Sequence, residues 1–257
     1  MSRFGNLEFE SNEQPRHGAE SESRDGAYWM ASAEAAYQAM DFELALRHYS
    51  RVLEFEPGSI PAWTGQVRVL IELGEYREAR VWADKALERF PTAPELLAAK
   101  AVALGRLGDL DPALAFSDAS LEERGDTAYI WLARGDVLLA RKERRADYCF
   151  EKACALEPNG WWIHWLAARI RHHYGQFAAA LKLAQHAAAA APGNWVVWLL
   201  CGDCETALGF AGNARRSYQQ VADLNPEFRE IRERIHQLDR RGILSRVTGW
   251  FRQGLRS

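Results

Sequence analysis

A proline that closes an amphipathic helix recurs along this chain at an almost constant interval. The stretch GEYREARVWADKALERFP ends at Pro91, and the equivalent places are held by Pro57, Gly125, Pro158, Pro192 and Pro226. Successive places are separated by 34, 34, 33, 34 and 34 residues. A fixed period of this size indicates repeated copies of one supersecondary unit, so the sequence predicts a six-fold array.

Small residues recur at fixed positions within the copies. An alanine stands twelve residues before every closing position, at Ala45, Ala79, Ala113, Ala146, Ala180 and Ala214. We expect two helices to cross closely there, because a larger side chain would force them apart. Four copies also have a glycine seventeen residues before the closing position, at Gly74, Gly108, Gly175 and Gly209, where the chain turns between helices. The fourth copy is one residue short in this turn.

A tryptophan completes the pattern six residues after the closing position, at Trp63, Trp131 and Trp198. Together these spacings resemble the tetratricopeptide repeat (TPR) family, in which each unit is an antiparallel helix pair. The resemblance implies an all-α fold, a right-handed superhelix of about six TPR helix hairpins. The copies cover residues of about 26–59, 60–93, 94–127, 128–160, 161–194 and 195–228.

The two ends of the chain differ from the array. Residues 1–25 are rich in acidic side chains and poor in apolar ones, so we expect this segment to be disordered. Residues 229–241 continue an apolar stripe of Phe228, Ile231, Ile235 and Leu238, which predicts the C-terminal capping helix that a repeat array needs to cover its last core face.

Residues 242–257 predict a basic amphipathic tail helix. Its apolar arc contains Ile243, Leu244, Val247, Trp250, Phe251 and Leu255. The arginines fall outside this arc. Three surfaces can order such a short helix: the array itself, a partner protein or a second copy of the chain, and an anionic membrane. We interpret the tail as an intermolecular docking element. Peripheral membrane contact and self-association are therefore possible roles that the sequence predicts for it.

Composition and charge narrow the class of protein. With 48% hydrophobic residues the chain can bury a core, and its net charge of -3 makes a nucleic-acid partner unexpected. No signal peptide and no apolar stretch of about 18 residues is seen, and four cysteines do not form a secreted disulfide framework. We therefore expect a cytoplasmic protein.

Candidate catalytic and metal-binding groups are few. His164, His172 and His173 have no acidic or cysteine partner at ligand spacing, and the pair Cys201 and Cys204 lies within a predicted helix. Buried cysteines are the expected interpretation of that CxxC. No phosphate loop, nucleophile elbow or carboxylate pair occurs. The sequence predicts no enzyme activity, no metal site and no cofactor.

The resemblance implies where a ligand binds. In the TPR family the second, fifth, ninth, twelfth and thirteenth positions of each unit, hereafter the groove positions, line a concave groove. We expect a protein or peptide ligand at the aromatic end of this groove, and the predicted ligand residues are Tyr129, Leu132, Asp136, Trp162, Trp165, Arg169, His172, Leu199 and Asp203. The alternative for Trp162 and Trp165 is packing against the next repeat.

The family also clamps chaperone C-terminal carboxylates with Lys and Asn at set groove positions. This chain lacks that set, since its ninth positions are Glu34, Arg68, Val102, Asp136, Arg169 and Asp203. The predicted function is a non-enzymatic scaffold or adaptor that binds a peptide or helix of a partner in the groove. The alternative is a membrane-peripheral assembly factor that is recruited through the tail.

Overall fold

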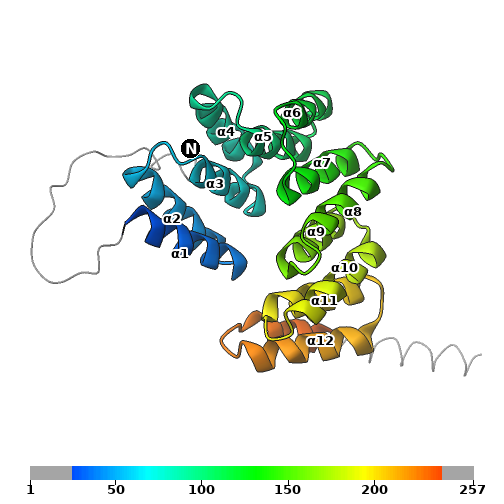
Figure 1. Ribbon diagram of the computed structural model, residues 1–257. Coiled ribbons are helices and arrows are strands. Elements are labelled where there is room, and N and C mark those ends of the chain that lie inside the picture. Colours follow the sequence, from blue (N-terminus) through cyan, green and yellow to red (C-terminus); the bar gives the residue numbers. More distant parts are fainter. Residues whose placement is uncertain (1–24, 239–257) are drawn as a thin grey trace, which may run out of the picture. The chain divides into compact units, whose positions relative to one another are not determined.

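The computed structural model describes residues 25–238 (Figure 1). Within this range every regular element is a helix, and the predicted all-α class is confirmed. The helices are α1 (Gly26–Gln38), α2 (Phe42–Phe55), α3 (Ile60–Glu72), α4 (Tyr76–Arg89), α5 (Pro94–Leu107), α6 (Leu110–Glu122), α7 (Ala128–Ala140), α8 (Ala146–Leu156), α9 (Trp161–His173), α10 (Phe177–Ala190), α11 (Trp195–Ala207) and α12 (Ala211–Leu224). Residues 230–238 form a further helical segment, the terminal helix.

The helices belong to two compact units. Unit 1, residues 1–153, contains α1 to α7 and most of α8. In it each helix from α1 to α6 packs against the next one, and α5 also contacts both α3 and α7. Unit 2, residues 154–257, contains α9 to α12 and the terminal helix, and α11 contacts α9, α10 and α12. Each unit is therefore a stack of helix hairpins in which first helices of successive hairpins meet.

The six aligned alanines lie where the helices cross. Each begins or follows the first turn of a second helix, and none is more than 1% exposed. Close helix contact leaves no room for a longer side chain at these positions. The burial of all six alanines agrees with the prediction that they lie in tight helix contacts.

All six hairpins turn by the same backbone motif. In the second hairpin Gly74 donates its N–H to the carbonyl of Ile71, and the next residue donates to Leu70, which is the Schellman pattern that ends a helix. The four predicted glycines have φ between 73° and 91°. The same slot is held by Met40 in the first hairpin and by Lys142 in the fourth, with φ of 63° and 60°. Unit 1 thus contains two turns whose side chains disfavour the left-handed conformation.

The recurring tryptophans form hydrogen bonds to the loops that connect successive hairpins. Trp63 and Trp198 donate their indole N–H to the carbonyls of Pro57 and Pro192, the residues that close the preceding copies. Where glycine replaces proline, the indole of Trp131 donates to the Asp126 carboxylate instead. In the second and sixth copies the six-residue spacing of proline and tryptophan therefore matches a hydrogen bond to the residue that closes the preceding copy.

The terminal helix covers the end of unit 2. Ile231 and Leu238 are buried, and the ring of Phe228 lies 4.9 Å from that of Trp195. The predicted tail residues Ile243, Leu244, Val247, Trp250, Phe251 and Leu255 lie outside the described residues, as do residues 1–24. The docking role of the tail stays a prediction. In the described part of the chain no helix is both long and apolar enough to span a bilayer.

Candidate functional site

The groove positions of unit 1 engage one another. The guanidinium of Arg68 on α3 lies 4.3 Å from the ring centre of Tyr129 on α7 and 5.1 Å from that of Tyr37 on α1. We call these three residues the tyrosine–arginine cluster. The hydroxyl of Tyr37 donates to Glu72, which adds a negative charge beside the arginine. Burial raises the pKa of the Tyr129 phenol well above its ordinary value, although the nearby Arg68 acts in the opposite direction.

A buried ion pair occupies the next groove positions of unit 1. Arg106 on α5 donates to both oxygens of Asp136 on α7, at 3.0 Å from Nε and 2.6 Å from Nη2. The two side chains are only 9% and 3% exposed. A bidentate pair in this environment satisfies both charges internally, so Asp136 serves helix packing in this structure.

In unit 2 one face of α9 carries four groove positions, Trp162, Trp165, Arg169 and His172, which we call the α9 stripe. The rings of Trp162 and Trp165 are stacked with centres 4.8 Å apart, and the guanidinium of Arg169 lies 4.8 Å from the Trp165 ring. Trp165 is 1% exposed and donates its indole N–H to the Val196 carbonyl on α11. Trp162 is half-buried. Trp165 thus packs between repeats, whereas Trp162 keeps part of its surface exposed.

Two further predicted ligand residues are buried in the interior of their units. Leu132 and Leu199 are almost completely buried, because the fifth position of a first helix faces its neighbours in the stack. They join Trp165 and Asp136 as residues that hold the repeats together. Of the predicted set, Tyr129, Trp162, Arg169, His172 and Asp203 keep some exposure.

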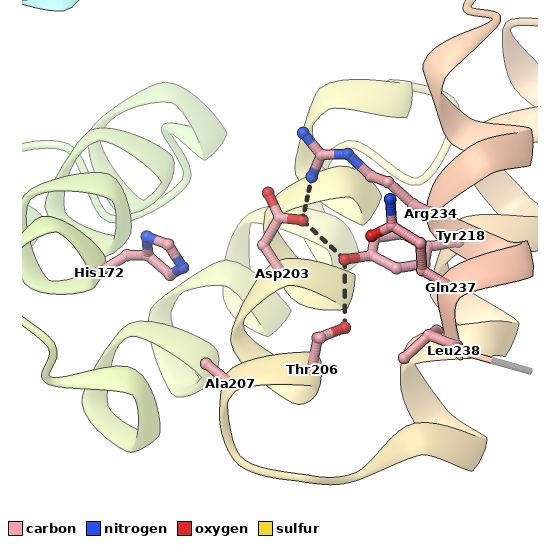
Figure 2. A pocket seen from close by; sticks show the side chains of 8 residues that line it. All are labelled: His172, Asp203, Thr206, Ala207, Tyr218, Arg234, Gln237 and Leu238. Carbon is pink, nitrogen blue, oxygen red and sulfur yellow. Dashed lines mark hydrogen bonds and ion pairs between the residues drawn. The ribbon is translucent and has the colours of Figure 1, made fainter. Parts of the chain in front are cut away.

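The α9 stripe ends at a pocket of about 560 Å³ inside unit 2, which we call the terminal pocket (Figure 2). Its lining residues are His172, Asp203, Thr206, Ala207, Tyr218, Arg234, Gln237 and Leu238. Figure 2 shows His172 on one side, facing Asp203 and Arg234 across the open space. The pocket is therefore built from α9, α11, α12 and the terminal helix.

Hydrogen bonds fix the far wall of the pocket. One oxygen of Asp203, Oδ1, accepts from the Tyr218 hydroxyl at 2.7 Å and from the Arg234 guanidinium. The Tyr218 hydroxyl also lies 3.2 Å from that of Thr206. Burial raises the pKa of Tyr218 to about 12, and the negative charge of Asp203 acts in the same direction, so the phenol stays protonated.

The opposite wall carries a neutral histidine. Burial lowers the pKa of His172, and Arg169 and Arg234 lower it further, while Asp203 opposes them. At neutral pH the imidazole therefore presents one N–H donor and one acceptor. The pocket thus combines an arginine, a carboxylate, an imidazole and an amide around one space of ligand size.

Comparison with known proteins places this arrangement in a family. A sequence model described as "Tetratricopeptide repeat" matches residues 7–154, more than half of the chain. The chain belongs to the TPR family. A crystallised TPR protein from Parabacteroides merdae is 16% identical, with a TM-score of 0.52 over 85% of this chain and 86% of that one. A second TPR structure, from Thermus thermophilus, gives 0.51 at 13% identity over 83% of this chain and 98% of that one. Both likenesses concern the fold.

Among the curated relatives that the chain matches is Hsp70-Hsp90 organizing protein 1 of Arabidopsis thaliana. It is 33% identical over 129 residues, which are 46% of this chain and 22% of that protein. The TPR chain described here thus spans about a fifth of the length of that relative.

Several pocket residues lie outside the positions that the TPR pattern predicted. Tyr218 is on the second helix of the sixth hairpin, and Arg234 and Gln237 are on the terminal helix, which is not part of a repeat. One signal for Tyr218 was present, since Gly202 stands in the middle of α11 and a Cβ there would lie 2.3 Å from the tyrosine ring. A glycine inside a helix marks such a close approach.

The cysteines of this TPR chain are packing residues. Cys149, Cys201 and Cys204 are buried, and Cys154 is partly exposed. Burial raises the pKa of Cys201 and of Cys204 to about 12, and neighbouring acidic groups add to the effect. A thiol in this state is a poor nucleophile and a poor metal ligand at neutral pH, which agrees with the interpretation of the CxxC as core.

Proposed function

We propose that the chain is a non-enzymatic adaptor that binds a segment of a partner protein along the α9 stripe and the terminal pocket. The observation that carries this proposal is the different state of the groove positions in the two units. In unit 1 the large polar side chains contact one another, whereas in unit 2 a half-buried tryptophan leads to a pocket with unused hydrogen-bonding groups. Tryptophan and arginine are the side chains that most often dominate binding energy at interfaces.

The family supports a protein partner. TPR relatives carry names such as Hsp70-Hsp90 organizing protein, which describe assembly of other proteins. A chaperone tail is a poor candidate for this chain, because the ninth groove positions hold no Lys or Asn. We therefore propose a partner segment whose chemistry fits the α9 stripe, and we propose the cytoplasm as the place where it is met.

A selection from a random peptide library displayed on phage tests the proposal. The full chain should enrich peptides, and Trp162→Leu should weaken the binding of those peptides by about tenfold. Leucine keeps the position apolar, so circular dichroism should show unchanged helical content. Trp131→Leu is the matched control, because Trp131 is also half-buried but lies outside the α9 stripe.

Two outcomes would contradict the proposal. The first is that the full chain enriches no peptide. The second is that Trp131→Leu weakens binding as much as Trp162→Leu does, which would mean that tryptophan loss acts through general destabilisation.

A further inference from the structure

We propose that the terminal pocket binds an acidic side chain of the partner segment while an apolar side chain of the same segment lies on Trp162. This inference rests on the proposed function and adds the chemistry of the ligand. It is drawn from the charges, the unused hydrogen-bonding groups and the dimensions of the α9 stripe and the pocket.

The charges around the pocket favour an anion. Arg169 on α9 and Arg234 on the terminal helix carry two positive charges, and both act on His172 between them. Asp203 supplies one negative charge, and its Oδ1 is already engaged by Arg234 and Tyr218. Arg234 is the positively charged residue in the pocket lining, so a carboxylate that enters can pair with its guanidinium in a partly desolvated site.

The pocket also has donors to offer. Arg234 donates to Asp203 and also interacts with the Tyr218 hydroxyl, and a guanidinium has five N–H groups, so others remain for a ligand. Gln237 and His172 line the same space, and no side-chain hydrogen bond from the described part of the chain engages either of them. A carboxylate can accept from several such donors, and charge-assisted bonds of this kind are about twice as strong as neutral ones.

The length of the α9 stripe sets the spacing within the ligand. Trp162 and His172 are ten residues apart on α9, which is about 15 Å along the axis at 1.5 Å per residue. An extended peptide advances about 3.3 Å per residue. The apolar and acidic side chains of an extended ligand should therefore be separated by about four or five residues.

Synthetic peptides test this chemistry directly. The first has eight residues, acetylated and amidated ends, and a fluorescein label, with Phe near its start and Glu five residues later, among Ser and Gly. Two others carry Gln or Lys in place of Glu. In fluorescence polarisation with the full chain, the Glu peptide should bind about fivefold more tightly than the Gln peptide, and the Lys peptide most weakly.

Two variants with opposite expected effects on the affinity make the test more specific. Arg234→Gln should weaken binding of the Glu peptide about fivefold, whereas Asp203→Asn should strengthen it about twofold to threefold, because it removes the repelling charge and keeps an acceptor for Tyr218. Arg232→Gln is the control, since Arg232 is exposed on the same helix outside the pocket. It should leave the affinity unchanged apart from a small salt-dependent effect.

Protonation gives an independent readout. A bound carboxylate faces His172 and opposes the two arginines that depress its pKa, so binding should raise that pKa and take up a proton. The affinity for the Glu peptide should therefore rise as the pH falls from about 7 to about 5.5, and His172→Asn should remove this dependence. The groups that face the imidazole are Arg169, Asp203, Tyr218 and Arg234.

The results separate this inference from the proposed function. If library peptides bind but the Glu, Gln and Lys peptides bind equally, or if the Lys peptide binds most tightly, the acidic ligand is wrong and the adaptor stands. The same conclusion follows if the Glu peptide does not bind although the protein still selects library peptides. If the library itself enriches nothing, the proposed function fails first.

Discussion

In unit 1 the arginine at a ninth groove position, Arg68, lies between the rings of Tyr37 and Tyr129, whereas in unit 2 the arginine at the same position, Arg169, lies over the ring of Trp165 beside a pocket. The residue types are alike. The difference is that Arg68 lies between rings of two other helices, α1 and α7, whereas the ring beside Arg169 belongs to its own helix, α9. Whether a groove residue is available to a ligand therefore depends on its own side chain and also on the neighbouring helices that contact it.

The acidic ninth positions repeat this contrast. Asp136 in unit 1 pairs both of its oxygens with Arg106 and is almost fully buried. Asp203 in unit 2 uses one oxygen, and its ion pair with Arg234 is 25% and 35% exposed at the two side chains. One carboxylate completes the interior of a unit, and the other forms the wall of a pocket.

The largest expected effect follows from this pair of carboxylates. Asp136→Asn leaves the Arg106 charge buried without its counter-ion and should lower the free energy of unfolding by about 3–5 kcal/mol. Asp203→Asn, in a half-exposed network, should lower it by about 1 kcal/mol or less. Urea unfolding followed by circular dichroism measures both.

The double variant Arg106→Met with Asp136→Leu is the control for the buried pair. It removes both charges and should recover much of the stability that Asp136→Asn loses. Equal losses for Asp136→Asn and Asp203→Asn would break the distinction between the two units.

The sequence predicted the scaffold better than the site, for physical reasons. The alanines and glycines were recognisable because the same crossing and the same turn are built six times, which repeats one steric demand at one spacing. The terminal pocket depends on Arg234, which lies on a helix that occurs once and so has no counterpart in the period. The sequence left open whether Trp165 packs against the next repeat or contacts a ligand, because the answer depends on the neighbouring hairpin, whose Val196 carbonyl accepts the indole N–H.

Substitutions in the turns should change the stability by an intermediate amount. Unit 1 has Met40 and Lys142 at positive φ, whereas both turns of unit 2 that occupy this slot have glycine, Gly175 and Gly209. Met40→Gly and Lys142→Gly should each raise the free energy of unfolding by about 0.5–1 kcal/mol, because the left-handed conformation strains a side chain. Gly175→Ala and Gly209→Ala should lower it by a similar amount.

Thermal unfolding measures these changes, and Lys142→Ala separates charge from conformation. Alanine removes the ammonium group but keeps the strained backbone, so this variant should be no more stable than the natural chain. Stabilisation by Lys142→Ala equal to that by Lys142→Gly would show that charge, and not the backbone, is responsible.

The smallest expected effect is a pH dependence in unit 2. Glu205 is buried on α11 and accepts a hydrogen bond from Ser217 at 2.7 Å, whereas the buried carboxylate of unit 1, Asp136, is paired with an arginine. Burial raises the Glu205 pKa, and Ser217 and Arg216 offset this only in part. The folded state therefore holds the proton more tightly than the unfolded state does. This contribution to stability is complete below the unfolded pKa of about 4.3 and is lost as the pH rises through the folded pKa.

Glu205→Gln tests this dependence. The variant cannot ionise, so the difference in unfolding free energy between variant and natural chain should grow in favour of the variant as the pH rises from about 4 to 7. Ser217→Ala keeps the carboxyl group and removes a hydrogen bond that lowers its pKa, so the pH dependence should persist and become steeper. A difference that is constant across this range would mean that Glu205 titrates alike in both states.

The tyrosine–arginine cluster has a consequence for how the chain unfolds. In a solenoid each repeat normally touches only its neighbours, so hairpins at an end can detach one after another. Here Arg68 joins α1 of the first hairpin to α7 of the fourth by way of the second. Opening the first hairpin alone breaks a contact in which the fourth takes part. This coupling should make the first four hairpins melt as one cooperative block rather than fray from the N-terminal side.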